Sequence, residues 1–177
     1  CSFYWCSKLK QIKIPDSVTQ IGSHTFNHCS ALTNIQFVSP SSLRKIGKSC
    51  FKNCSSLTHI EIPSSVKLIE SCAFYECSSL KEITIPSSVK YVKSNAFRKC
   101  SSLNHIEFES QDSLKYLGKR CFMLCTSLEK IVIPLSITKI DNGTFEGCSS
   151  LKQVIIHSSV TSIKSRAFKK CTSLVEI

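Results

Sequence analysis

The chain has 177 residues, 12 cysteines and a formal net charge of +11, and 42% of its residues are hydrophobic. A chain of this length and composition can bury a core, which excludes global disorder. No apolar run is long enough to span a membrane, and no signal peptide is visible. The first and last repeats, described next, are cut short, so we expect residues 1–177 to be a segment of a longer chain.

Phe-x-x-Cys is the most regular feature of the sequence. It occurs eight times, from Phe3 to Phe168, in steps of 23 or 25 residues. The copies are joined by Ser-Ser-Leu-x-x-Ile-x-Ile-Pro-Ser-Ser-Val-x-x-Ile and close variants, and both 25-residue units have a longer turn, at 37–43 and 108–114. Registered copies at such a period indicate stacked repeats. We therefore predict a single repeat domain over 1–177, without a linker.

Each unit predicts three elements in chain order. Leu-x-x-Ile-x-Ile has the pattern of a half-buried strand, and equivalent strands of stacked coils would pair in a parallel ladder about 4.8 Å apart. Proline follows this strand in four units and ends it, because proline has no N–H to donate. Val-x-x-Ile predicts a second short extended stretch. Phe-x-x-Cys is too short for a free helix and predicts a 3₁₀ or one-turn helix with Phe in the core.

The repeat of residues 77–97, Cys-Ser-Ser-Leu-x-x-Ile-x-Ile-Pro-Ser-Ser-Val, ending in Ala-Phe, resembles the BspA-type leucine-rich repeat. The resemblance covers essentially the whole chain. It implies a leucine-rich repeat solenoid of β-rich right-handed coils with a parallel β-ladder. It also implies a protein that is not an enzyme, with no cofactor and no fixed catalytic residues. Members of the family are associated with adhesion to host proteins and cells, and with surface antigens of bacteria and parasitic protists.

The cysteine content alone would suggest disulfides or zinc sites. However, eight of the 12 cysteines occupy one repeat position. Zinc ligands must converge on a point, whereas residues 23 apart in stacked coils form a line. We therefore expect one buried thiol per coil. The pairs Cys50/Cys54 and Cys121/Cys125 are closer in sequence, and we expect both thiols of each pair to face the core.

The positive charge is uneven within the repeat. From Cys through the main strand there are six basic and six acidic residues, whereas from Val-x-x-Ile through Phe-x-x-Cys there are 17 basic and four acidic ones. Stacking would align this excess as a basic stripe that attracts acidic glycans or anionic membrane, with nucleic acid disfavoured because no aromatic residues interleave. A solvated surface is the alternative. The basic stripe comprises Lys45, Lys48, Lys52, Lys67, Lys93, Arg98, Lys99, Lys119, Arg120, Arg166, Lys169 and Lys170.

One exposed column of the main-strand face contains His59, Glu82 and His105 in consecutive coils. Histidines beside a carboxylate could bind zinc or sense pH. The two histidines would lie about 9.6 Å apart, twice the strand spacing, which is wide for one metal ion. The spacing favours a polar column with a weak His–Glu contact.

The second exposed column turns apolar at Val132 and Ile155, and Leu135 replaces a turn serine nearby. These three residues predict a modest hydrophobic contact site. Packing against further chain is the open alternative. Tyr4 and Trp5, in the first unit, could likewise form a contact site for a partner or pack against further chain.

The chain carries no Gly-x-Ser-x-Gly, no phosphate-binding glycine loop and no His-Glu-x-x-His, so we expect no enzyme. The favoured hypothesis is an adhesive protein-binding module at the cell surface or outside the cell. Its partners would be extracellular-matrix or host-cell proteins and acidic glycans. The competing hypothesis is a cytoplasmic scaffold that docks along its length into a larger assembly. Sequons at Asn53 and Asn142 would carry glycan only if the chain is secreted.

Overall fold

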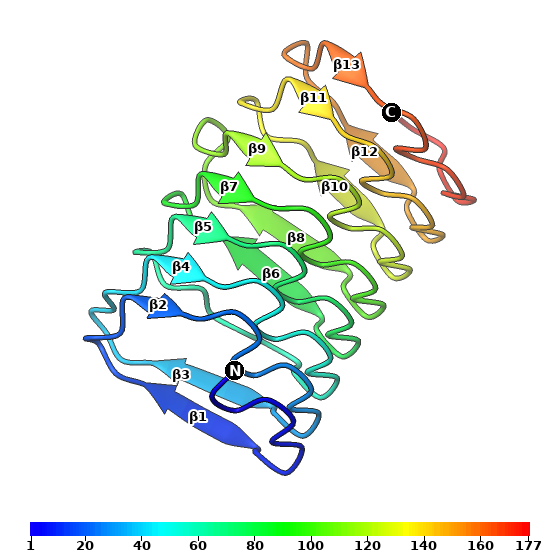
Figure 1. The fold of residues 1–177 in the computed structure, drawn as a ribbon. Helices are drawn as coiled ribbons and strands as arrows, with labels where there is room; N and C mark the ends of the chain where they lie inside the picture. Colours follow the sequence, from blue (N-terminus) through cyan, green and yellow to red (C-terminus); the bar gives the residue numbers. More distant parts are fainter.

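The computed structural model describes residues 1–177. The chain forms a stack of β-coils without any helix, and its two termini lie at opposite ends of the stack (Figure 1). All strand pairs are parallel and join equivalent positions of neighbouring coils. The predicted solenoid with parallel ladders is therefore confirmed. None of its elements is a helix that could cross a membrane.

Two kinds of strand lie on different sides of the stack (Figure 1). Those that follow the repeat leucine are called the main strands: β1 (Gln11–Ile14), β3 (Asn34–Phe37), β6 (Glu82–Ile85), β8 (His105–Phe108), β10 (Lys130–Val132) and β12 (Gln153–Ile155). Those of the Val-x-x-Ile segments are called the second strands: β2 (Gln20–Ile21), β4 (Lys45–Ile46), β5 (Leu68–Ile69), β7 (Tyr91–Val92), β9 (Tyr116–Leu117), β11 (Lys139–Ile140) and β13 (Ser162–Ile163). Apolar residues alternate inward along the main strands, as in the buried–exposed pattern of β6 and β8.

The main-strand ladder is not continuous, and this corrects the prediction. β1 pairs with β3, β6 with β8, and β10 with β12, but these pairs are not joined to one another. Residues 59–62 occupy the main-strand position between β3 and β6, yet their backbone makes no hydrogen bond to either neighbour. The second strands are more regular, with one five-stranded sheet from β2 to β9 and the pair β11–β13.

Proline accounts for the three interruptions of the main-strand ladder. They separate β3 from residues 59–62, those residues from β6, and β8 from β10. In each case the later coil has proline at the sixth residue after its repeat leucine: Pro63, Pro86 and Pro134. Proline has no N–H, so it cannot donate to the carbonyl that the preceding coil offers there.

Two coils without proline at this position form the bond and keep the ladder, whereas the coil of β12, which has His157 there, stays paired to β10 without it. The N–H of Val38 donates to the carbonyl of Ile14 (3.0 Å), and that of Glu109 donates to the carbonyl of Ile85 (3.1 Å). The strands that precede them, β3 and β8, are both paired to the coil before. Proline thus ends the strand, as predicted, and also releases it from the preceding coil.

The Phe-x-x-Cys segments are turns, so the predicted 3₁₀ or one-turn helices are absent. Around Phe97, the residues two before and two after it, Asn95 and Lys99, have φ of 59° and 62°, and other units repeat this pattern. A helix needs negative φ at consecutive residues, so these left-handed residues break it into separate turns. The N–H of Phe97 instead donates to the carbonyl of Cys121 in the next coil (2.9 Å).

The core is a stack of phenylalanine rings flanked by thiols. Successive rings from Phe3 to Phe168 lie 5.1–5.7 Å apart between centroids and are nearly parallel. The repeat cysteines are buried from Cys29 through Cys148, as predicted, and Cys50 and Cys121 are buried beside them. Seven repeat thiols donate to the phenylalanine carbonyl of the preceding coil, with S···O distances of 3.0–3.2 Å.

Candidate functional site

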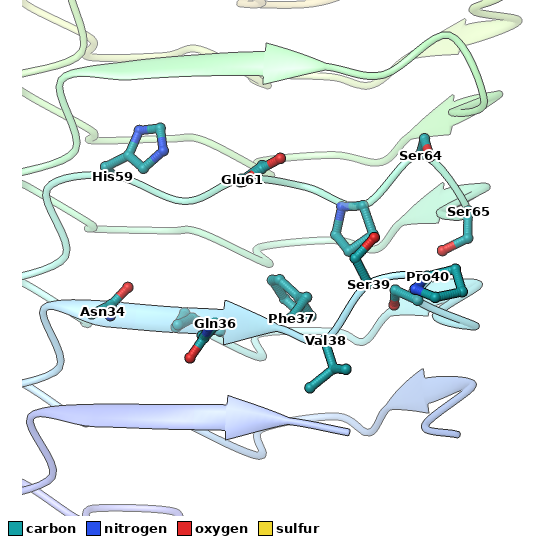
Figure 2. A pocket seen from close by; sticks show the side chains of 13 residues that line it. Asn34, Gln36, Phe37, Val38, Ser39, Pro40, His59, Glu61, Ser64 and Ser65 are labelled. Atoms are coloured by element: carbon teal, nitrogen blue, oxygen red, sulfur yellow. The ribbon is translucent and has the colours of Figure 1, made fainter. Parts of the chain in front are cut away.

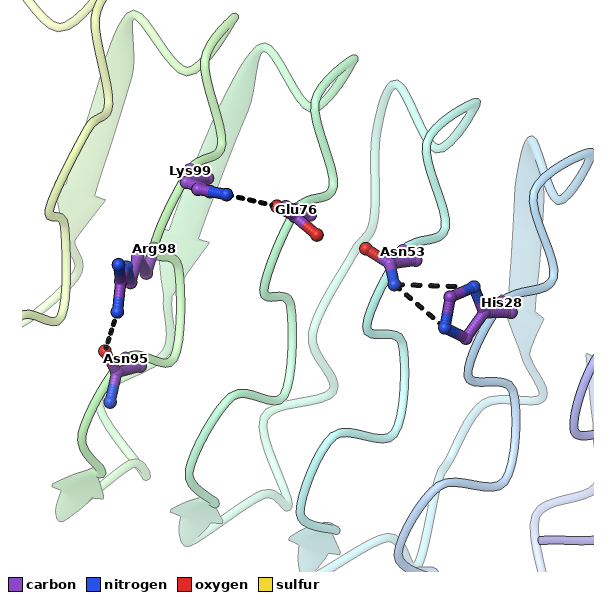
Figure 3. A network of polar contacts seen from close by, with 6 residues as sticks. All are labelled: His28, Asn53, Glu76, Asn95, Arg98 and Lys99. Carbon is purple, nitrogen blue, oxygen red and sulfur yellow. Dashed lines mark hydrogen bonds and ion pairs between the residues drawn. The ribbon is translucent and has the colours of Figure 1, made fainter.

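The basic stripe lies along the Val-x-x-Ile segments and the Phe-x-x-Cys turns. Polar side chains meet at these turns, between neighbouring coils in the pair Glu76/Lys99 and within one coil in the pair Asn95/Arg98 (Figure 3). Only two of the 12 stripe residues form ion pairs: Lys45 with Glu70 at 3.3 Å, and Lys99 with Glu76 at 2.6 Å. The hydrogen bond and the negative charge of Glu76 raise the pKa of Lys99. The other stripe cations have no carboxylate within ion-pair distance and remain free for a partner.

Three stripe residues gather around one tyrosine. The Nζ atoms of Lys52 and Lys99 lie 5.0 and 5.7 Å from the ring centroid of Tyr75, and the Cζ atom of Arg98 lies 5.6 Å from it. These distances allow cation–π attraction, which holds the three cations near the ring. Positive charge from the two coils that flank the coil of Tyr75 is therefore concentrated at its ring.

A small hollow of about 160 Å³ interrupts the same face near its C-terminal end. Arg120 and Arg166 line it from the coils on either side. Gly143 occupies the equivalent position between them and contributes no side chain, which leaves the hollow open. Glu146 also lines the hollow and adds a negative charge to it.

The column of His59, Glu82 and His105 lies on the main-strand face, as expected. Glu82 and His105 are direct neighbours in the β6–β8 register. Nδ1 of His59 lies 3.5 Å from Oε1 of Glu82, and both side chains are more than half exposed. A contact between two exposed groups contributes little. No group of three or more His, Cys, Asp or Glu side chains is arranged to hold a metal ion.

The apolar candidates lie together on the main-strand face. Val132 and Ile155 are direct neighbours in the β10–β12 register, and both are half-buried. Leu135 follows Pro134 in the next turn and is 43% exposed. These residues, Val132, Ile155 and Leu135, are called the apolar patch below.

The aromatic residues of the first unit form a separate cluster. The ring of Trp5 stacks on His28 at 4.3 Å between centroids, and Tyr4 meets both rings edge-on. Nδ2 of Asn53 lies 3.0 Å from Nε2 of His28, so this sequon residue already has a partner (Figure 3). Trp5 is 58% exposed.

A groove of about 610 Å³ lies between β3 and residues 59–62 (Figure 2). β3 and the turn after it supply one wall, and the segment from His59 to Ser65 supplies the other. The groove lies where the ladder is interrupted at Pro63, beside the long turn of the first 25-residue unit. Glu61 is its only formally charged lining residue and has no ion-pair partner.

Sequence reasoning placed His59 on the exposed face but missed the groove beside it. Two signals in the sequence could have found the groove: the proline at residue 63 and the two extra residues in the turn before it. The thiol-to-carbonyl bonds were also missed, because their direction depends on the offset between neighbouring coils.

Comparison with known proteins agrees with this architecture. A family model described as BspA type leucine rich repeat region matches residues 1–112 and 44–175, in six copies. The solved structure of the T. pallidum leucine rich repeat protein is 27% identical with a TM-score of 0.84, and covers 93% of this chain and 78% of that one. A leucine-rich repeat protein from Bacteroides ovatus ATCC 8483 is 26% identical with a TM-score of 0.53, over 98% and 67% of the two chains. No curated protein sequence matches.

Proposed function

This chain belongs to the BspA-type leucine-rich repeat family, and we propose that it is a non-enzymatic protein-binding module of a cell-surface protein. Its partners would be extracellular-matrix or host-cell proteins. Members of this repeat family are typically protein-interaction modules. The observation that carries the proposal for this chain is the apolar patch, where Val132, Ile155 and Leu135 interrupt an otherwise polar strand face.

The patch is tested by placing a charge in it. Val132→Asp and Ile155→Asp are expected to weaken binding to immobilised extracellular-matrix proteins at least tenfold while urea unfolding stays cooperative. Thr84→Asp is the matched control, because Thr84 occupies the same exposed column in β6. Equal binding by all four proteins would contradict a role for the patch.

Location is tested separately, with antibody on intact and on permeabilised cells of the source organism. Staining of intact cells is expected. Staining that requires permeabilisation would favour the cytoplasmic scaffold instead.

The convergence of Lys52, Arg98 and Lys99 on Tyr75 favours a second candidate function, binding of acidic glycans to the basic stripe. We expect Lys52→Gln together with Arg98→Gln to lower the salt concentration that elutes the protein from heparin. Lys130→Gln, on the main-strand side, is the control with the smaller effect. Retention that salt does not change would contradict the glycan proposal.

A further inference from the structure

The five-stranded sheet of second strands has an outer face on a different side of the stack from the apolar patch (Figure 1). In each coil, two residues lie between the inward residues of Val-x-x-Ile. Val89 and Val92, for example, are fully buried. Lys90 and Tyr91, between them, point away from the core, and Tyr91 is 40% exposed. Because the strands pair in register, equivalent outward side chains form columns along the sheet.

One of these columns is apolar and aromatic in three consecutive coils. Leu68 is the direct neighbour of Tyr91 in the β5–β7 register, and Tyr91 is that of Tyr116 in the β7–β9 register. Leu68 and Tyr116 are half-buried. Sequence reasoning found no aromatic residues among the basic ones, and the register corrects this, because it places both tyrosines beside lysines. Leu68, Tyr91, Tyr116 and the adjacent Lys93 are called the tyrosine face below.

Lys93 links the two tyrosines. Its Nζ lies 5.2 Å from the ring centroid of Tyr91 and 5.3 Å from that of Tyr116, distances at which cation–π attraction acts. Gly118 occupies the position of Lys93 in the next coil and has no side chain that could come between the ammonium group and Tyr116. The ammonium group covers one face of each ring, which leaves less ring surface for a nucleic-acid base or a sugar to stack on.

A column of basic residues runs beside the tyrosine face. The N–H of Lys90 donates to the carbonyl of Lys67 (3.0 Å), and that of Lys115 donates to the carbonyl of Lys90 (2.8 Å). Equivalent residues of paired strands lie about 4.8 Å apart, so these charges are closely spaced. No side chain of the column forms an ion pair, and neither does Lys93. The basic column comprises Arg44, Lys67, Lys90 and Lys115.

The positive charge of this face is not compensated within the chain. Glu70 is the one carboxylate at the outward positions of these four coils, and Lys45 pairs with it at 3.3 Å. The face therefore has an apolar centre and a positive margin. Protein interfaces commonly combine an apolar centre, in which tyrosine is enriched, with a polar rim. Complementary charge then selects a partner that is negative where it meets the margin.

We propose that the tyrosine face docks a partner protein through a segment that combines acidic and apolar side chains. The acidic side chains lie against the basic column and Lys93, and the apolar ones lie against Leu68 and the two tyrosines. The proposal rests on the proposed protein-binding function, and it adds a second surface whose partner has a stated charge.

The probe is the capped peptide Ser-Glu-Leu-Glu-Glu-Leu-Glu-Ser, titrated into the ¹⁵N-labelled chain of 177 residues. We expect the amide signals of Leu68, Tyr91, Lys93 and Tyr116 to shift. Glutamine in place of glutamate should abolish binding, because the charge attraction is lost. Alanine in place of leucine should weaken binding about tenfold, because less apolar surface is buried.

Two further ligands test the other classes of acidic partner. They are a heparin-derived tetrasaccharide and a six-nucleotide single-stranded oligothymidylate. Both carry negative charge but no leucine, so we expect each to bind the tyrosine face more weakly than the peptide does.

Two variants locate the site. Lys93→Gln removes the central cation and is expected to weaken peptide binding several-fold. Tyr91→Ser removes an exposed ring and is expected to weaken binding about tenfold while urea unfolding stays cooperative. Lys164→Gln is the matched control, because it makes the same change as Lys93→Gln at the same repeat position three coils away. It should bind the peptide as the natural chain does.

Four outcomes would overturn the proposal: no shifts at the tyrosine face, equal binding of the leucine and alanine peptides, tighter binding of the tetrasaccharide or the oligonucleotide at the same residues, or normal peptide binding by both Lys93→Gln and Tyr91→Ser. The result is separable from the proposed function, because Val132→Asp and Ile155→Asp should bind the peptide normally. Failure of the peptide test with intact dependence of matrix binding on the apolar patch would reject the tyrosine face alone.

Discussion

Cys100 shows what a repeat cysteine contributes at the scale of one residue. Its side chain is fully buried, and its thiol donates to the carbonyl of Phe74 in the preceding coil (S···O 3.1 Å). That carbonyl also accepts from the N–H of Cys77 in its own coil, and the bond from the Cys100 thiol links it to the next coil. Burial could be predicted from the repeat position, whereas the bond could not, because it depends on how far one coil is displaced over the next.

Replacing this thiol should be costly. Cys100→Ala removes a buried sulfur and its hydrogen bond, so we expect the free energy of unfolding to fall by about 1–2 kcal/mol. Urea unfolding measures the change. Cys6→Ala, at the exposed repeat cysteine of the first unit, should have almost no effect. Equal effects of the two substitutions would show that the buried thiol is not part of the stabilising core.

At the scale of the element, sequence and structure agree on where strands lie but not on which of them pair. Residues 59–62 have the same alternation of exposed and buried side chains as β6. The pattern therefore predicted a strand in both, correctly for β6 only. Side-chain alternation reports burial, whereas the pairing of β3 and β8 to the coil before them includes a bond donated by the residue after the strand. Pro63 removes that donor, and the groove next to it follows from a residue that sequence reasoning treated only as a strand end.

Glycine directly follows the second strands β2 and β4, at Gly22 and Gly47. A Cβ at Gly47 would lie 2.5 Å from the carbonyl oxygen of Ile21, whereas one at Gly22 would lie 3.5 Å from its nearest neighbour, Oγ1 of Thr25. We expect Gly47→Ala to lower the free energy of unfolding by about 1–3 kcal/mol, because the added carbon meets backbone that cannot move aside cheaply. Gly22→Ala is the matched control at the same repeat position and should change it by less than about 0.5 kcal/mol. Similar values for both would contradict the close approach at Gly47.

At the scale of the whole molecule, each coil mainly contacts its two neighbours. The structure of the stack therefore follows from the structure of one coil and its contacts with the next. The repeat alone therefore predicted the architecture, the stacked phenylalanines and the line of thiols. It did not predict the interruptions, because a repeat pattern describes an average coil and the interruptions arise where individual coils depart from it.

The line of buried thiols makes the free energy of unfolding depend on pH in the alkaline range. Burial is the main cause that raises the pKa of these thiols above the ordinary value of 9.0, so the folded chain keeps protons that the unfolded chain releases. The stabilisation is present below pH 9 and is lost as the pH rises above it, by up to about 1.4 kcal/mol per pH unit for each such thiol. The thiols are those of Cys50, Cys54, Cys77, Cys100, Cys121, Cys125 and Cys148.

Urea unfolding from pH 7 to pH 10 tests this dependence. We expect the free energy of unfolding to fall increasingly steeply above pH 9. In Cys100→Ala, one fewer proton is released on unfolding at high pH, so the slope of this free energy against pH should be smaller by up to about 1.4 kcal/mol per pH unit. A free energy that does not change across this range would contradict the burial of the thiols.

Amide hydrogen exchange, resolved by residue, tests most directly the claim that proline opens the main-strand ladder. Glu61 shares its repeat position with Gln36 and Glu107, which lie in the paired strands β3 and β8. We expect the amide of Glu61 to exchange at nearly the unprotected rate and those of Gln36 and Glu107 to be strongly protected. Pro63→Val should bring the amide of Glu61 into the protected class. Equal protection of all three amides in the natural chain, or no gain at Glu61 in the variant, would contradict this claim.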